Sequence, residues 1–521
     1  MIHRNAETQG FLEGIQIKEE SGAEGSYILH HTHHNYATAD IRQAPETADE
    51  FLAAGVEQEE GGEKWRAGDA AKSLRFFMRA IAIYDEGLQK HPQAFDLAYN
   101  KARLQYEITQ HPKLAAQLPA PLLDALQIAL RSHREALNLE QDNADALFNT
   151  AQVLTSLAEA GTDTKHPSDE QLSEAIKLLQ EAIELFQRCL VLQEMRYTEM
   201  QEQLKQMESG YMGPPEEEMK QAQEIMDSAG ESDPSEPHEQ WAAVIEPVTK
   251  NTLVDTAVAQ LDTLTTLSNL LTFNPGVGLA WVEEYSSDLL QKIPVYLEGS
   301  ERQYEASLAR AKFICALNEL VYRSGRIEVE TYHREIMRAF GPDLDISTDP
   351  DGLCSKADAL TSFNTALTDL PPFHDAEALA RSLDLRWQSL SIALDALTKA
   401  SKLPDANNLP KIHLARGDVE MHRWRLGLAP WEYAVAEQNS STLLQNAQTY
   451  YRGAAALARR DGAMEETRDG TCKEAIAAAL GGQKDKLEQL KAAAPKELTA
   501  VAQDVVEDGL LAPVDMEALL S

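Results

Sequence analysis

A short arrangement of side chains recurs six times along this chain and limits the folds that the chain can adopt. A small residue is followed four positions later by a bulky one, and three positions after that by another small one. These steps place the three side chains on one stripe of an α-helix, where small residues admit a neighbouring helix and the bulky residue fills the gap. The six instances are Ser73-Phe77-Ala80, Ala129-His133-Ala136, Ala175-Leu179-Ala182, Ala359-Phe363-Ala366, Ala393-Leu397-Ala400 and Ala447-Tyr451-Ala454.

This recurrence predicts an all-α fold, a solenoid of stacked antiparallel helix pairs with insertions between them. A single amphipathic helix needs no fixed small-bulky-small order, so its repetition indicates helices that interlock in pairs. The 521 residues exceed one ordinary core, but each pair in a solenoid buries its apolar face only against its neighbours. The aromatic content of 6% suits helices packed through Ala and Leu better than a β-sandwich.

Small and apolar residues near residue 70 also follow the spacing of a 34-residue helical repeat. They are Gly61, Gly68, Asp69, Ser73, Phe77, Ala80 and Ile83. In these residues, and in segments 144–151 and 174–182, the sequence resembles the tetratricopeptide repeat (TPR) family. The resemblance is good over residues 50–193 and patchy over 300–460, and it implies helix hairpins without specifying a ligand. Ser168 and Gln171 form a capping-box pattern before the second of these segments.

Breaks in the helical pattern divide the chain into five expected segments. These are an N-terminal arm (1–46), N-terminal TPR-like repeats (47–208), an acidic insert (209–240), C-terminal TPR-like repeats (241–483) and capping helices (484–521). We expect the cap to dock, because it carries Val501, Val505, Leu510 and Leu511. The arm contains His30-His31-Thr32-His33-His34, which could bind zinc, nickel or copper. Without a flanking fold to fix the ligand geometry, we interpret it as a polar tail and expect no metal site.

The charge of the chain indicates what it can bind. There are 84 acidic and 47 basic residues, so the net charge is −37. Such a field repels nucleic acid and anionic membranes and attracts basic protein surfaces. The alternative interpretation is that the acidic excess only keeps an extended helical protein soluble.

The segment from Glu194 to Glu239 concentrates two residue types. It holds 13 acidic residues against three basic ones, and six of the 12 methionines. Flexible thioethers adapt to varied apolar surfaces, so the insert is a candidate contact for a basic, amphipathic client. The expected contacts are Glu216, Glu217, Glu218, Asp227, Glu231 and Asp233, with Met212 and Met219 as apolar anchors. The alternative is that its methionines pack on their own solenoid.

Motifs for catalysis or cofactor binding do not emerge from the sequence. Gly276-Val277-Gly278 lacks the third glycine of a phosphate-binding loop, and the four cysteines are scattered as expected for buried thiols. We therefore expect a non-catalytic protein without a cofactor. The sequence contains no run of 18 apolar residues, the length needed to span a membrane, and the first ten residues lack the apolar core of a signal peptide. These features favour the cytoplasm, with the nucleus as a second location.

One ligand implied by the TPR resemblance can be checked residue by residue. TPR domains that hold the C-terminal Glu-Glu-Val-Asp of heat-shock chaperones use a clamp of Lys and Asn, then Asn, then Lys and Arg, on three successive first helices. In register, these positions are occupied by Gln58, Gly62, Asn100, Asp145 and Asn149. Only Asn100 matches, and Asp145 would repel a carboxylate. We therefore do not expect this chain to bind a heat-shock chaperone tail, and we interpret Asn100 as a helix-packing amide.

Two functions of different classes remain open at this point. The first is an acidic TPR-type adaptor or assembly escort for a basic protein client, similar to the helical escorts of histones or ribosomal proteins. The second is a structural scaffold subunit of a stable multiprotein complex. A helical enzyme of unrecognised type is a weaker alternative.

Overall fold

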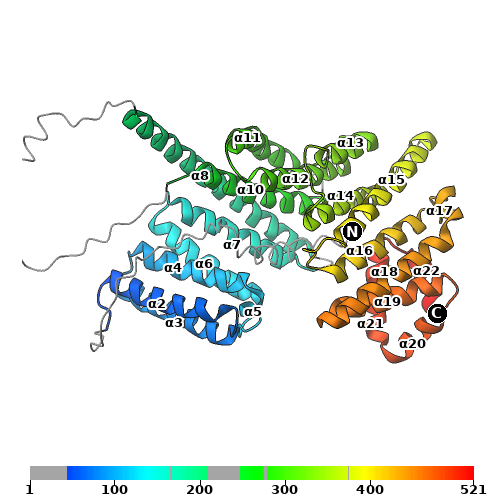
Figure 1. Cartoon of the computed structure of the whole chain (residues 1–521), viewed down its shortest axis with the longest axis horizontal. Helices are drawn as coiled ribbons and strands as arrows, with labels where there is room; N and C mark the ends of the chain where they lie inside the picture. The colour runs from blue at the N-terminus through cyan, green and yellow to red at the C-terminus, as the bar shows by residue number, and fades with distance from the viewer. Residues whose placement is uncertain (1–43, 165–166, 209–246, 275–277, 373–374) are drawn as a thin grey trace, which may run out of the picture.

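The structure is a computed structural model that describes residues 44–164, 167–208, 247–274, 278–372 and 375–521. Within these ranges every regular element is an α-helix, so the all-α prediction is confirmed. Successive helices lie side by side along the length of the molecule, as Figure 1 shows. The helices of the first half are α2 (Ala48–Arg66), α3 (Ala70–Lys90), α4 (Phe95–Gln110), α5 (Pro112–Ala115), α6 (Leu122–Leu139), α7 (Ala144–Thr162), α8 (Asp169–Glu208), α10 (Lys250–Leu271), α11 (Leu279–Leu297) and α12 (Gln303–Arg323).

The second half continues the same architecture and ends in a group of short helices. Its main hairpins are formed by α14 with α15 and by α16 with α18, while α19 packs on α18. Its helices are α13 (Val329–Ala339), α14 (Pro350–Asp369), α15 (Ala376–Ala400), α16 (Leu409–Arg425), α17 (Ala434–Gln438), α18 (Ser440–Asp461), α19 (Met464–Leu480), α20 (Asp485–Ala493), α21 (Pro495–Glu507) and α22 (Pro513–Leu520).

Side-chain caps fix where several of these helices begin. Thr47 and Glu50 form a capping box at the start of α2, and the Asp69 carboxylate accepts the backbone N–H of Lys72 at the start of α3. The capping box predicted before α8 is confirmed. Ser168 N–H donates to Gln171 Oε1 at 2.8 Å, and Gln171 N–H donates to Ser168 Oγ at 3.2 Å.

The residues of the recurring small-bulky-small pattern lie where the helices pack. They occupy α3, α6, α8, α14, α15 and α18, and all of them are buried except Ala359, which is half-buried. Two of the bulky residues press against a glycine of the paired helix. A Cβ on Gly62 would lie 2.3 Å from Phe77 Cε1, and a Cβ on Gly417 would lie 2.3 Å from Tyr451 Cε1. At these two places the ring occupies the space that any other residue would need.

The start of α19 corrects a boundary that the sequence suggested. The apolar pattern predicts a helix from Cys472 to Leu480, whereas α19 begins at Met464. Gly470 therefore lies inside the helix. A Cβ there would lie 2.9 Å from the backbone nitrogen of Ala455, so the glycine lets the backbones of α18 and α19 approach closely.

The apolar interior is divided into separate clusters along the chain rather than gathered into one core. One cluster joins Ala175 and Leu179 of α8 to Leu253 and Leu261 of α10, across the 209–246 segment. Another joins α18 and α19 to the last helices. In that cluster Val501, Val505, Leu510 and Leu511 are buried, as expected of a docked cap. This division is the packing that a helical repeat protein requires.

A cluster of buried charged groups links α16, α18 and α19. Lys473 Nζ lies 2.8 Å from Asp418 Oδ1, 3.0 Å from Asp418 Oδ2 and 3.8 Å from Asp508 Oδ2. The Tyr451 hydroxyl donates to Asp418 Oδ1 at 2.7 Å. Burial alone would lower the pKa of Lys473, but the two carboxylates outweigh it and hold this pKa above its ordinary value. Lys473 is therefore a buried cation that depends on its carboxylate partners.

Polar side chains connect the first helices of successive hairpins. The Tyr106 hydroxyl of α4 lies 2.9 Å from Ser156 Oγ of α7, and Thr155 Oγ1 of α7 lies 3.1 Å from Thr263 Oγ1 of α10. Glu159 of α7 accepts from Thr266 of α10 at 3.1 Å. Burial raises the pKa of Glu159 to about 7, against the opposing effect of the Thr266 hydrogen bond. The contact between α7 and α10 therefore contains a carboxyl group that is mostly protonated below about pH 7.

This glutamate gives the stability of the chain a specific pH dependence. Because the pKa of Glu159 in the folded chain, about 7, lies above the ordinary value of 4.5, protonation stabilises the fold below pH 4.5. That contribution is lost as the pH rises through 7. We expect the melting temperature of the wild type to fall more between about pH 5 and pH 8 than that of Glu159→Gln, which stays neutral. Parallel pH profiles for the two proteins would contradict the assignment.

Within the described ranges, no helix combines the length and the apolar character needed to cross a membrane.

Candidate partner-binding groove

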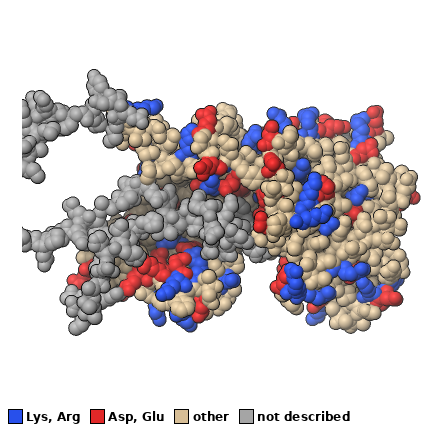
Figure 2. Space-filling view, in the orientation of Figure 1, with Lys and Arg blue, Asp and Glu red and all other residues tan. Residues whose placement is uncertain are grey.

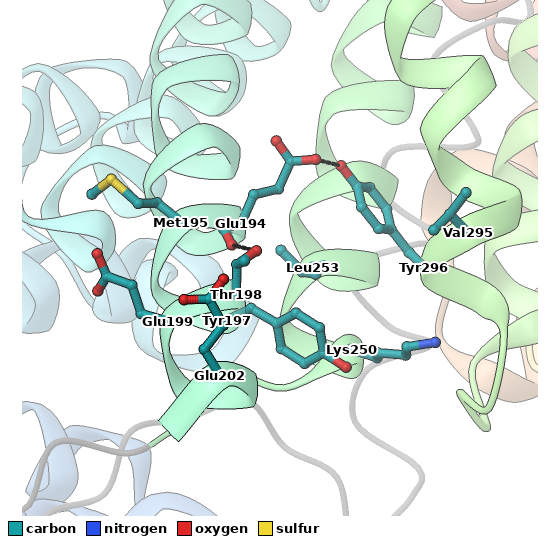
Figure 3. Close-up of a pocket in the computed structure, with 10 residues that line it drawn as sticks. All are labelled: Glu194, Met195, Tyr197, Thr198, Glu199, Glu202, Lys250, Leu253, Val295 and Tyr296. Atoms are coloured by element: carbon teal, nitrogen blue, oxygen red, sulfur yellow. Dashed lines mark hydrogen bonds between the residues drawn. The ribbon is translucent and has the colours of Figure 1, made fainter. Parts of the chain in front are cut away.

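An open groove of about 710 Å³ lies where the C-terminal part of α8 meets α10 and α11 (Figure 3). Its floor and walls come from segments that are far apart in the sequence, since α8 and α11 are about a hundred residues apart. Its lining residues are Glu194, Met195, Tyr197, Thr198, Glu199, Glu202, Lys250, Leu253, Val295 and Tyr296. A volume of this size accommodates several side chains of a partner.

The unusual length of α8 creates one wall of the groove. The helix has 40 residues, and its end projects from the body of the molecule in Figure 1. Glu194 fixes the junction with α11, because its carboxylate accepts from the Tyr296 hydroxyl and lies 3.0 Å from Lys292 Nζ. Beyond Glu194, α8 continues for about four further turns to Glu208, whereas α11 ends at Leu297.

The charges at the bottom of the groove are satisfied within the chain. Burial would lower the pKa of Lys292, but hydrogen bonds to Glu194 and Asp288 outweigh it and raise this pKa. Burial, together with the Glu194 carboxylate, raises the pKa of the Tyr296 hydroxyl. Lys250 donates to the backbone carbonyl of Glu298 at the end of α11. Glu194, Lys292 and Lys250 therefore have structural partners and hold α8, α10 and α11 together.

The rim of the groove differs from its floor in both charge and polarity. Figure 3 places Met195 and Glu199 on the side of α8 away from α11, with Glu202 one turn further on. Both glutamates are exposed, and no ion pair within the described part of the chain involves either of them. Met195 is 51% exposed, and Val295 on the opposite wall is 58% exposed. The rim thus combines free carboxylates with apolar side chains that no other part of the described chain covers.

The structure does not test the binding residues that were expected from the sequence. The eight contacts proposed in the insert, together with the histidines of the N-terminal arm, lie outside the described residues, so their role stays a prediction. The groove residues were not singled out, although Glu194, Met195, Glu199 and Glu202 belong to the acidic, methionine-rich segment noted in the sequence. An exposed methionine among carboxylates on a long helix was the signal that could have identified them.

Two of the five positions of the chaperone-tail clamp lie at contacts between helices, and Asn100 bonds within its own helix. Asn100 Nδ2 donates to the Asp96 carbonyl at 2.8 Å, one turn earlier in its own helix. Asn149 Nδ2 donates to the Tyr99 hydroxyl at 2.8 Å and so joins α7 to α4. Gly62 faces the Phe77 ring. Asn149 and Gly62 therefore join neighbouring helices, whereas the hydrogen bond of Asn100 lies within α4.

These features define a helical repeat protein with an acidic-rimmed groove. No protein-family model matches the chain. Over 117 residues it is 36% identical to the UPF0656 protein C926.02 of Schizosaccharomyces pombe, a match that covers 22% of this chain and 25% of that protein. The chain thus spans a quarter of the length of that curated relative.

Among solved structures, the chain is similar to a circular tandem repeat protein with novel repeat topology and enhanced subunit contact surfaces. The TM-score is 0.29 at 13% sequence identity, over 89% of this chain and 99% of that one. A TM-score of this size does not establish a shared fold.

Proposed function

We propose that this chain is a non-catalytic adaptor or assembly escort that holds a basic segment of a protein client. The observation that carries the proposal is the groove rim, where Glu199 and Glu202 lie beside the exposed Met195 and Val295. A carboxylate that has no cation partner within the described part of its chain can pair with Lys or Arg of a partner, and the neighbouring apolar groups gain by being covered.

The distribution of charge supports the same proposal. The net charge of −37 attracts basic surfaces at long range. In the face shown in Figure 2, Asp and Glu gather over the N-terminal hairpins, whereas the C-terminal half shows several groups of Lys and Arg. Some acidic residues of the N-terminal hairpins are already neutralised, since Arg103 pairs with Glu59 and Glu107 between α2 and α4. The acidic rim of the groove is thus a more specific attraction than the overall charge.

We further propose that the array is of the TPR type. The support comes from the first three hairpins, α2 with α3, α4 with α6 and α7 with α8, which follow one another as paired helices. The residues that resemble the family in sequence lie at their packing positions, with Phe77, Leu147 and Leu179 all buried.

A structural scaffold subunit is the second candidate function. It is favoured by apolar side chains exposed on the helices of the first two hairpins. These are Met78 on α3 (49% exposed) and Leu122, Leu123 and Ile128 on α6 (46%, 37% and 41% exposed). A stable partner that covered them would be held by apolar contacts rather than by charge.

Salt distinguishes the two functions. If the chain is an escort, proteins purified with it at low ionic strength should be basic and should dissociate between roughly 0.1 and 0.5 M salt, because ions screen exposed charge pairs. Mass spectrometry of the released fraction identifies these proteins, with the isoelectric points of the whole lysate as the reference. Partners that persist through the highest salt, or that match the lysate in charge, would favour the scaffold instead.

A further inference from the structure

We propose that the groove binds an amphipathic, basic α-helix of a protein partner, which lies across the rim formed by the exposed face of α8 and the end of α11. This inference rests on the proposed function and specifies its partner. Two turns of the bound helix would contact the rim, with cationic side chains toward Glu199 and Glu202 and apolar ones toward Met195 and Val295.

The arrangement of α8 and α11 defines where such a helix fits. Glu184 acts electrostatically on Tyr285, and Glu194 bonds to Tyr296 further along, so the two helices run in the same direction. α11 ends at Leu297, whereas α8 continues to Glu208. The 14 residues of α8 after Glu194 extend about 21 Å at 1.5 Å per residue. The end of α8 therefore extends past α11 and presents an exposed face that is long enough to contact a helix.

Apolar side chains give this site its floor and edges. Leu253 is buried beneath the groove, and Met195 and Val295 are more than half exposed above it. Covering these groups with the apolar stripe of a helix is the usual helix-in-groove mode of recognition.

The spacing of the free carboxylates fits a helix better than an extended chain. Glu199 and Glu202 are three residues apart on α8, which is a rise of about 4.5 Å. Cationic side chains three or four residues apart on a partner helix project at a similar separation on one face. In an extended strand, side chains on one face recur every second residue at about 7 Å. The carboxylates are thus matched by one turn of a Lys- or Arg-bearing helix.

Charge also argues against the neighbouring segment of this chain as the occupant. Residues 209–240, which connect toward α10, contain nine acidic residues and one basic one, Lys220. A segment of that charge is repelled by the carboxylates at the rim. A basic partner is attracted by the same groups.

Synthetic peptides of about 16 residues test this inference on the full-length protein. One peptide has leucines on one helical face and lysines on the other, and its isomer has the same composition in an order that spreads both around the helix. Binding is measured by fluorescence anisotropy, and helix formation by circular dichroism. We expect the amphipathic peptide to bind more tightly and to gain helix on binding.

Variants locate the binding site. Glu199→Gln/Glu202→Gln should weaken binding of the amphipathic peptide about fivefold, because two exposed ion pairs are lost. Val295→Lys, at an exposed helical position, should weaken it about tenfold or more by repulsion and by loss of apolar contact. The matched control is Glu497→Gln/Glu517→Gln, which removes the same charge from exposed positions in α21 and α22 and should leave the affinity unchanged.

Each other outcome has a defined meaning. If the isomer binds equally well without gaining helix, or if the control variant loses as much affinity as the groove variant, the helical site is overturned while the proposed escort function stands. If sedimentation shows a dimer that Val295→Lys dissociates, the groove is an interface between copies of this chain and the inference is overturned. If neither peptide binds at low salt, the inference and the proposed function are both wrong.

Discussion

Replacing Lys473 by methionine is expected to destabilise the C-terminal helices by about 3–5 kcal/mol, the range for breaking a buried ion pair by removing one partner. Lys473 is 4% exposed and lies between the carboxylates of Asp418 and Asp508. Methionine preserves most of the volume of the side chain, so the loss arises from the charge. Asp418, which also accepts from Tyr451, would stay buried without the ammonium that neutralises it. Amide hydrogen exchange in α18 measures the free energy of local opening.

Two further variants show whether the effect comes from this ion pair. Lys486→Met removes a half-exposed lysine that lies 2.5 Å from Glu474 and should cost less than about 1 kcal/mol. Adding Asp418→Asn to Lys473→Met should restore part of the lost stability, because it removes the uncompensated charge. In Lys473→Met alone, acidification should also reduce the deficit, since protonation neutralises the buried carboxylates. An equal loss in Lys473→Met and Lys486→Met would contradict the assignment.

Replacing Gly417 by alanine is expected to destabilise the hairpin of α16 and α18 by about 1–3 kcal/mol, the usual cost of overpacking a core. The new Cβ would lie 2.3 Å from Cε1 and 2.6 Å from Cδ1 of Tyr451. That ring is 1% exposed and its hydroxyl is held by Asp418, so it cannot move aside without breaking a buried hydrogen bond. The strain outweighs the gain in helix propensity of about 1 kcal/mol that alanine otherwise gives.

Gly453 on α18 supplies the matched control for this substitution. Its nearest neighbour would be His413 Nδ1 at 3.6 Å from a new Cβ, which is an ordinary contact. Gly453→Ala should therefore be neutral or stabilise the hairpin, by up to about 1 kcal/mol. The two variants are compared by urea denaturation followed by circular dichroism. Equal stabilities for Gly417→Ala and Gly453→Ala would mean that Tyr451 does not set the distance between α16 and α18.

Much of the fold follows from local features that a sequence displays. The small-bulky-small pattern depends only on helical spacing, and residues such as Ala129, Leu179 and Tyr451 lie at the packing positions that it predicts. Ala359 is the exception, since it sits half-buried at the edge of its cluster. The start of α19 was predicted too late, because residues 464–471 are mostly polar and carry no apolar pattern that would reveal the first turns of the helix.

The groove was harder to predict because it depends on contacts between distant segments. Glu194 and Tyr296 are separated by 102 positions, and only the folded chain brings them together. The sequence did identify the acidic, methionine-rich character of the segment that contains Met195 and Glu199. The sequence could not show that α8 extends beyond the end of α11, since the lengths of two helices do not reveal how the helices are aligned. The residues expected to bind a client were therefore placed later in the same segment.

The division of the interior into separate clusters has a consequence for how such a chain can change during evolution. Leu179 of α8 and Leu253 of α10 share one cluster even though residues 209–246 separate the two helices. A stretch of dozens of residues has thus been accommodated at a junction without interrupting the packing on either side. Changes in the length of such a junction should therefore be tolerated, because they affect only the two helices next to it.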